Sequence, residues 1–196
     1  MTYDSITVTK SSPHVGAEIG NVDLTKPMSN SEVAEIRSAI NAHGVVFFRD
    51  QALDPESHDR FVRSFGEPHV HAGGKSTASK TVDGYPALRK QYFNEDSARI
   101  SGETWHSDQS CAEIPPMYSV LHQEIIPPDG GGNTMFLSAG KAYEELSPSM
   151  KAYLEGKTAT HTAGKAFDAK LTKDNKETHL IAEHPMVTVH PESGRK

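Results

Sequence analysis

The chain has 196 residues, of which 35% are hydrophobic and 23% are charged, and its formal net charge is −6. This length suits a single domain, residues 1–196, with a sizeable core, and the composition is globular rather than disordered. The negative charge gives no electrostatic reason to expect nucleic acid or an acidic membrane surface as a partner.

The first fifty residues predict two strands, a helix and a third strand. Residues 6–9 alternate and favour a strand, and residues 16–24 favour a second extended segment. Ser29-Asn30-Ser31-Glu32 has the pattern of a capping box, so a helix should begin there, and Gly44 should end it. The apolar residues 45–48 then predict a buried strand.

The following residues predict a second helix and a long loop. Asp54-Pro55 opens the helix, with Asp as the cap and Pro in the first turn, and Gly66 ends it. Residues 67–85 show no periodicity, so we expect a loop that lies over the functional site and moves without substrate. Residues 88–93 predict a strand.

The next stretch, Trp105-His106-Ser107-Asp108, resembles a site of chemistry more than scaffold. In a strand, alternate side chains share a face, so His106 and Asp108 would point the same way. An imidazole and a carboxylate side by side are two ligands of the two-histidine, one-carboxylate set that binds non-haem Fe(II). The alternative is that His-x-Asp arises here by chance, because short motifs carry a high false-positive risk.

The last third of the chain predicts mostly strands. They are expected at residues 117–126, 133–137, 158–162 and 186–190, with helices after Ser138 and Pro148, a mobile insertion at 167–178 and a hairpin turn at 191–194.

No returning strand follows that turn. We therefore expect this chain to be part of a longer one, with an unpaired edge at residues 186–190 where a second copy could pair to form a homo-oligomer. The alternative is that this strand pairs elsewhere and the tail frays.

The compartment is expected to be the cytoplasm. One cysteine, Cys111, cannot form an internal disulfide, which fits a reducing environment. The first residues lack a basic region followed by an apolar core, so no signal peptide is expected. No run approaches the roughly 18 apolar residues of a membrane span.

The order of these elements resembles the taurine dioxygenase-like (TauD/TfdA) family of Fe(II)- and 2-oxoglutarate-dependent dioxygenases. The resemblance runs from about residue 5 to the end of the chain. It is carried by separated stretches in the same order: Gly16-Ala17-Glu18-Ile19 with Asp23-Leu24, His43 to Gln51, Phe65 to His71, Trp105 to Asp108, Gly131 to Phe136, and His184 to Val187.

This resemblance implies a mainly β fold with flanking helices (α+β), a double-stranded β-helix or jelly roll that is incomplete at its C-terminus. It implies that His106 and Asp108 bind the metal, that Thr134 contacts the cosubstrate 2-oxoglutarate, and that His71 contacts the substrate. For Thr134 the alternative is an ordinary strand residue, and for His71 a solvated loop histidine.

The sequence also departs from the family pattern. No residue matches the family's second metal histidine or the arginine that binds 2-oxoglutarate, and the resemblance implies that both lie beyond Lys196. Gly74 and Gly102 stand where taurine-specific members carry polar or aromatic substrate contacts, which argues against taurine.

The resemblance therefore implies an enzyme that hydroxylates a small organic acid, such as a sulfonate or carboxylate, with Fe(II), 2-oxoglutarate and O2, producing succinate and CO2. Two alternatives stay open. One is a truncated, catalytically impaired fragment that acts at most as a binding module. The other is a zinc hydrolase with a bound water at an open position.

Overall fold

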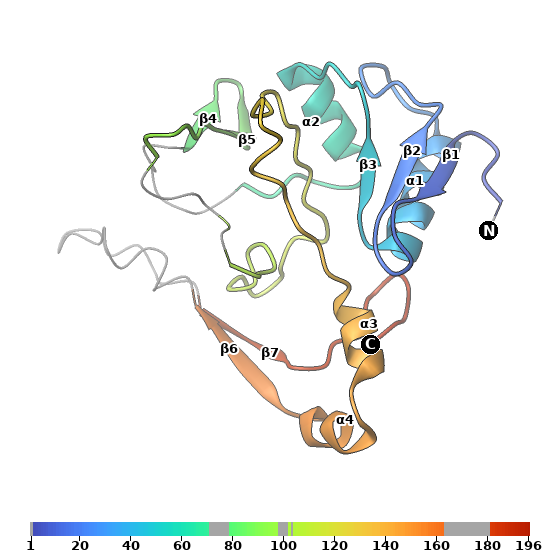
Figure 1. Cartoon of the computed structure of the whole chain (residues 1–196), viewed down its shortest axis with the longest axis vertical. Helices are drawn as coiled ribbons and strands as arrows, with labels where there is room; N and C mark the ends of the chain where they lie inside the picture. Colours follow the sequence, from blue (N-terminus) through green and yellow to red (C-terminus); the bar gives the residue numbers. More distant parts are fainter. Residues whose placement is uncertain (1, 71–78, 98–101, 103, 163–180) are drawn as a thin grey trace. The chain divides into compact units, whose positions relative to one another are not determined.

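A computed structural model describes residues 2–70, 79–97, 102, 104–162 and 181–196. Its residues cluster into two compact units (Figure 1). The first unit contains residues 1–68, 120–147 and 189–196, and the second contains residues 69–119 and 148–188. The predicted insertion at 167–178 lies outside the described residues.

The first unit is built on a three-stranded sheet with the order β1-β2-β3. β1 (Thr7–Lys10) and β2 (Ala17–Gly20) are antiparallel, whereas β2 and β3 (Val46–Phe48) are parallel. A parallel pair needs a crossover connection, and α1 (Asn30–His43) provides it by packing on β2 and β3. These elements confirm the order of strands and helix predicted for the first fifty residues.

The two helices of this unit begin where local sequence chemistry places them. At α1, Ser29 Oγ accepts from the Glu32 N–H at 3.2 Å, and the Glu32 carboxylate accepts from the Ser29 N–H at 2.7 Å. At α2 (Pro55–Arg63), Asp54 and Ser57 form the equivalent reciprocal pair. Both capping boxes satisfy N–H groups that a helix N-terminus leaves without intrahelical partners. The prediction that Gly66 ends α2 was wrong by two residues, because Ser64 already caps the helix.

The core of the first unit lies between the sheet and the two helices. It consists of six buried residues: Ile6, Ile19, Leu24, Ile36, Ala39 and Phe61. Phe61 makes edge contacts with Phe48 and Phe65, with ring centroids 5.7 and 5.3 Å apart. The strand predicted at residues 45–48 is present as β3, but its side chains are only half-buried, so the prediction that it is buried was wrong.

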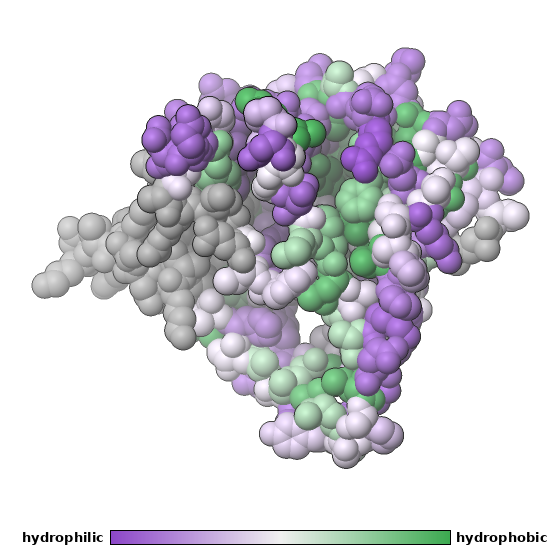
Figure 2. Space-filling model, in the orientation of Figure 1, coloured by the Kyte–Doolittle hydropathy of each residue, from purple (hydrophilic) through white to green (hydrophobic). Residues whose placement is uncertain are grey.

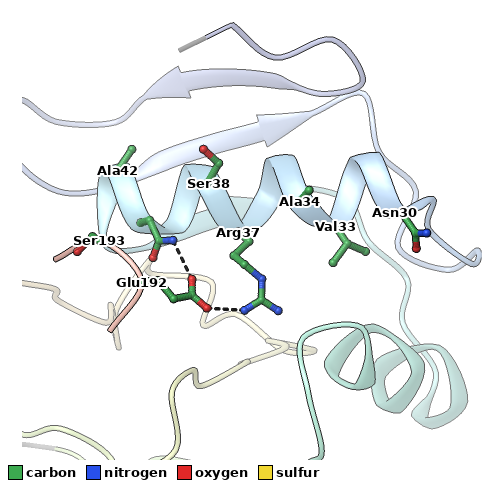
Figure 3. A pocket seen from close by; sticks show the side chains of 9 residues that line it. Asn30, Val33, Ala34, Arg37, Ser38, Ala42, Glu192 and Ser193 are labelled. Atoms are coloured by element: carbon green, nitrogen blue, oxygen red, sulfur yellow. Dashed lines mark hydrogen bonds and ion pairs between the residues drawn. The ribbon is translucent and has the colours of Figure 1, made fainter. Parts of the chain in front are cut away.

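The C-terminal turn packs on α1 within the same unit. The His190 N–H donates to the Arg195 carbonyl at 2.8 Å, which confirms the turn predicted at residues 191–194. Glu192 accepts from Arg37 and Asn41, and Figure 3 shows Glu192 beside α1 along a groove of about 590 Å³. These two contacts of Glu192 tie the turn to α1. The strand predicted at 186–190 was wrong, because the last strand covers residues 181–185.

The second unit contains two β hairpins and a short helix. β4 (Ser79–Val82) pairs with β5 (Tyr85–Gln91), and β6 (Thr158–Thr162) pairs with β7 (Ile181–Pro185), both antiparallel. α4 (Pro148–Leu154) precedes β6. β4 lies inside the predicted loop at 67–85, and β5 begins earlier than the strand predicted at 88–93. The loop prediction was therefore wrong for residues 79–85, while residues 71–78 lie outside the described part.

The strands predicted at 117–126 and 133–137 are absent from this fully described stretch, which adopts no regular structure before α3 (Ala139–Glu145). The alternating pattern exists in the sequence, but a strand also needs a hydrogen-bonding neighbour. Consequently Leu121, Ile125 and Met135 are 78%, 69% and 73% exposed. Figure 2 shows hydrophobic residues, in green, at the surface.

The described residues thus confirm a mixed α+β composition, with one three-stranded sheet and two two-stranded sheets. Within those residues, no helix is long and apolar enough to cross a membrane.

Candidate metal site

His106 and Asp108 lie together in the second unit. The His106 Nε2 atom is 3.3 Å from Asp108 Oδ1, and the two side chains are 50% and 55% exposed. The segment that carries them is irregular, with a turn beginning at Asp108. The predicted strand at this motif was therefore wrong, although the predicted proximity of the two side chains is confirmed.

The hydrogen bond on the other side of the His106 ring selects its tautomer. Nδ1 lies 2.7 Å from the Thr104 carbonyl oxygen, which can only accept. Nδ1 therefore carries the hydrogen, and in the neutral ring the Nε2 lone pair faces Asp108. Metal-binding histidines are commonly oriented by such a bond from the nitrogen that does not bind the ion.

The Asp108 carboxylate is oriented by a hydrogen bond to one of its oxygens. The Ser119 hydroxyl donates to Oδ2, while Oδ1 faces His106. A carboxylate oxygen and an imidazole lone pair repel each other at this distance unless a proton or a cation lies between them. Metal bonds to nitrogen and oxygen of about 2.0–2.2 Å would let one ion reach both atoms. The donor types and their separation therefore fit a divalent transition metal.

Gly102 lies against the His106 ring. Its φ is +86°, and a Cβ added there would be 3.3 Å from Cε1 of His106. That φ lies in the left-handed region, where a side chain is disfavoured. The space that a side chain at position 102 would need is also taken up by the His106 ring. Gly102 thus allows the backbone to approach the imidazole closely.

Two contacts of this arrangement could not be predicted from the sequence. Ser119 is 11 positions from Asp108, and His184 donates from Nε2 to the Ser110 and Ala112 carbonyls over 74 and 72 positions. Neither contact follows a helical or strand period, so only the folded chain reveals it.

The other two predicted site residues are Thr134 and His71. Thr134 belongs to the first unit, is exposed, and follows a turn in which the Gly130 N–H donates to the Pro127 carbonyl at 3.0 Å. His71 lies outside the described residues. In the part of the chain that the structure describes, no three or more His, Cys, Asp or Glu side chains gather as a metal site.

The sequence is similar to those of known proteins over nearly its whole length. A family model described as "Taurine catabolism dioxygenase TauD, TfdA family" matches residues 7–196. An alkylsulfatase from Acinetobacter baylyi is 31% identical, and the match covers 93% of this chain and 58% of the relative. An alpha-ketoglutarate-dependent sulfate ester dioxygenase from Pseudomonas putida is also 31% identical, covering 93% of this chain and 62% of the relative.

A solved structure agrees with these sequence matches. The crystal structure of a taurine dioxygenase from Burkholderia xenovorans superimposes with a TM-score of 0.71 at 34% identity, covering 98% of this chain and 62% of the other. The chain belongs to the TauD/TfdA family of dioxygenases, as the resemblance implied. Enzymes of this family use Fe(II), 2-oxoglutarate (alpha-ketoglutarate) and O2. The chain spans 58% to 62% of the length of the relatives named here.

Proposed function

We propose that the protein is an Fe(II)- and 2-oxoglutarate-dependent dioxygenase that hydroxylates a small organic acid and releases succinate and CO2. The observation that carries this proposal is the pairing of His106 Nε2 and Asp108 Oδ1 at 3.3 Å in a chain of this family. Under this proposal the chain forms most of a double-stranded β-helix domain over residues 1–196.

His106 and Asp108 would hold the iron. Imidazole is a borderline ligand that suits Fe(II), and the carboxylate offsets part of its charge. When bound, the ion would offer positions to 2-oxoglutarate and O2 and would activate O2, which is the oxidant of the reaction. The Thr104 carbonyl keeps the hydrogen of His106 on Nδ1, so that Nε2 is available to the metal. The Ser119 hydroxyl keeps the Asp108 carboxylate turned toward Nε2.

Thr134 would help to bind 2-oxoglutarate. Its hydroxyl can donate to a carboxylate oxygen, and the glycines at 130–132 permit a close approach of backbone to ligand. His71 would contact the substrate from the segment that follows α2.

The substrate would be a small sulfate ester, sulfonate or carboxylate. A named relative acts on sulfate esters, and another is a taurine dioxygenase. Taurine is disfavoured because Gly102 offers no side chain at a position where taurine-specific members carry a substrate contact. A small-molecule substrate, rather than nucleic acid or a membrane, agrees with the net charge of −6.

The test combines a spectrum with product analysis. Without O2, Fe(II) and 2-oxoglutarate together should give a weak visible charge-transfer band, which zinc cannot give. Addition of O2 with a panel of alkyl sulfates, alkyl sulfonates and carboxylates should then yield succinate in proportion to O2 consumed. Neither band nor succinate with Fe(II), but hydrolysis of an ester with Zn²⁺, would favour the zinc hydrolase. A band without turnover of any acid would identify a chain that binds the cosubstrate without catalysis.

A further inference from the structure

We propose that His184 is a positioning residue for Asp108, because it holds the backbone turn that follows this carboxylate. The inference rests on the proposed function, in which Asp108 binds the metal. All the residues that carry it belong to the second unit.

His184 is bonded to two carbonyls of one turn. It lies on β7, opposite Ala159 of β6, and its Nε2 atom is 3.0 Å from both the Ser110 and the Ala112 oxygens. A carbonyl oxygen only accepts, so Nε2 carries a hydrogen shared between them. Nε2 of His184 is thus engaged with the backbone of this turn, whereas Nε2 of His106 faces the Asp108 carboxylate.

The bonded turn needs external support. Gln109 has a φ of +52°, which costs free energy for a residue with a side chain, and the Ala112 N–H donates to the Gln109 carbonyl at 2.9 Å to close the turn. Ser110 and Ala112 follow Asp108 by two and four positions. Holding their carbonyls therefore fixes the direction in which the backbone leaves Asp108.

His161 restricts the orientation of the His184 ring. It lies on β6 opposite Ala182, and is therefore a diagonal neighbour of His184 on the hairpin. The two rings meet edge to face, with centroids 5.4 Å apart and an interplanar angle of 65°. An aromatic contact of this kind limits rotation of the ring and keeps Nε2 directed at the turn.

The consequence is a carboxylate held from two sides. Ser119 fixes the oxygen Oδ2 of Asp108, and His184 fixes the backbone behind it. Partners that orient a metal ligand typically change metal affinity by about 10–100-fold when they are removed. His184 should therefore affect metal binding without touching the metal.

The test compares two amide side chains at position 184. His184→Gln places an N–H donor the same number of bonds from the backbone as Nε2, whereas His184→Asn is one bond shorter and cannot reach the turn. Mn²⁺ serves as the probe, measured by electron paramagnetic resonance of the free ion and by quenching of Trp105, the one tryptophan of the chain and the neighbour of His106. Thermal unfolding of each variant is measured in parallel.

The expected result is a Kd for Mn²⁺ near the wild-type value for His184→Gln and about ten-fold weaker for His184→Asn, with similar unfolding temperatures. The proposal would be overturned if His184→Asn bound Mn²⁺ as tightly as the wild type. It would also be overturned if both variants lost Mn²⁺ affinity and unfolding temperature to the same extent. If His184→Asn does not fold, His184→Leu replaces it in the same comparison. A wild-type protein that binds Mn²⁺ no better than His106→Ala would instead overturn the proposed function.

Discussion

The His106 imidazole and the Asp108 carboxylate face each other at 3.3 Å, and each is held by a further hydrogen bond that leaves the facing atoms available. Both side chains are about half exposed, so their replacement removes little packing. We expect His106→Ala and Asp108→Ala to weaken Mn²⁺ or Fe(II) binding at least ten-fold and to abolish succinate formation, while unfolding temperatures change little.

Asp96→Ala is a matched control for this pair, because Asp96 is an exposed aspartate of the same unit. It should leave metal binding and succinate formation unchanged. Normal turnover of 2-oxoglutarate by either metal-site variant would show that the ion is bound elsewhere.

The Ser119 hydroxyl is the second support of Asp108. Loss of a hydrogen bond to a charged group costs about 1.5–3 kcal/mol, so Ser119→Ala should weaken Mn²⁺ binding roughly 10- to 100-fold. Ser119→Thr keeps the hydroxyl and should retain most of the affinity. Titration of both variants with Mn²⁺ measures this difference. Equal Mn²⁺ affinities of the two variants would show that the Ser119 hydroxyl does not support metal binding.

Glu35 provides a prediction about stability and pH. Its carboxylate accepts from the N–H groups of Asp4, Ser5 and Ile6 at 3.1, 3.0 and 3.2 Å and so ties the N-terminal segment to α1. Partial burial raises the pKa of Glu35, but the three N–H donors outweigh it and hold the pKa below its usual 4.5.

A carboxylate with a lowered pKa in the folded state stabilises the fold above its usual pKa, and this contribution is lost as the pH falls through the folded value. Glu35→Gln should therefore lower the unfolding temperature at pH 7 and make progressively less difference below about pH 4.5. Thermal unfolding between pH 7 and pH 3 measures this, with Glu113→Gln, an exposed control, expected to have no effect at any pH. A difference that persists undiminished at pH 3 would contradict the assignment.

The parts of the fold that the sequence predicts are those whose causes are local. The capping boxes at Ser29 and Asp54 involve residues three positions apart, so the helix starts were predictable. The strand predicted at 117–126 failed because pairing depends on a distant partner that an alternating pattern does not specify. His106 and Asp108 were found through a local motif, whereas Ser119 and His184 reach the site only through long-range contacts.

Thr134 tests the cosubstrate part of the proposal. If its hydroxyl donates to a carboxylate of 2-oxoglutarate, Thr134→Ala loses a hydrogen bond to a charged group, which costs about 1.5–3 kcal/mol. The Kd of 2-oxoglutarate should rise by roughly ten-fold or more while the Kd of Mn²⁺ stays near wild type. Thr134→Ser keeps the hydroxyl and should bind the cosubstrate well. An unchanged cosubstrate affinity in Thr134→Ala would assign this residue an ordinary structural role.

Gly102 allows a steric test of the His106 position. Gly102→Ala adds a Cβ 3.3 Å from Cε1 of His106 and also strains the backbone at a φ of +86°. Gly84 separates the two effects, because its φ is +81° and a Cβ there would meet nothing within 4 Å. Each alanine should destabilise the fold by about 1–2 kcal/mol, since both positions force a side chain into the left-handed region. Only Gly102→Ala should also push the imidazole away from Asp108 and weaken Mn²⁺ binding several-fold, as followed by quenching of Trp105. Equal Mn²⁺ affinities in the two variants would mean that the His106 ring is free to move aside without losing its position as a ligand.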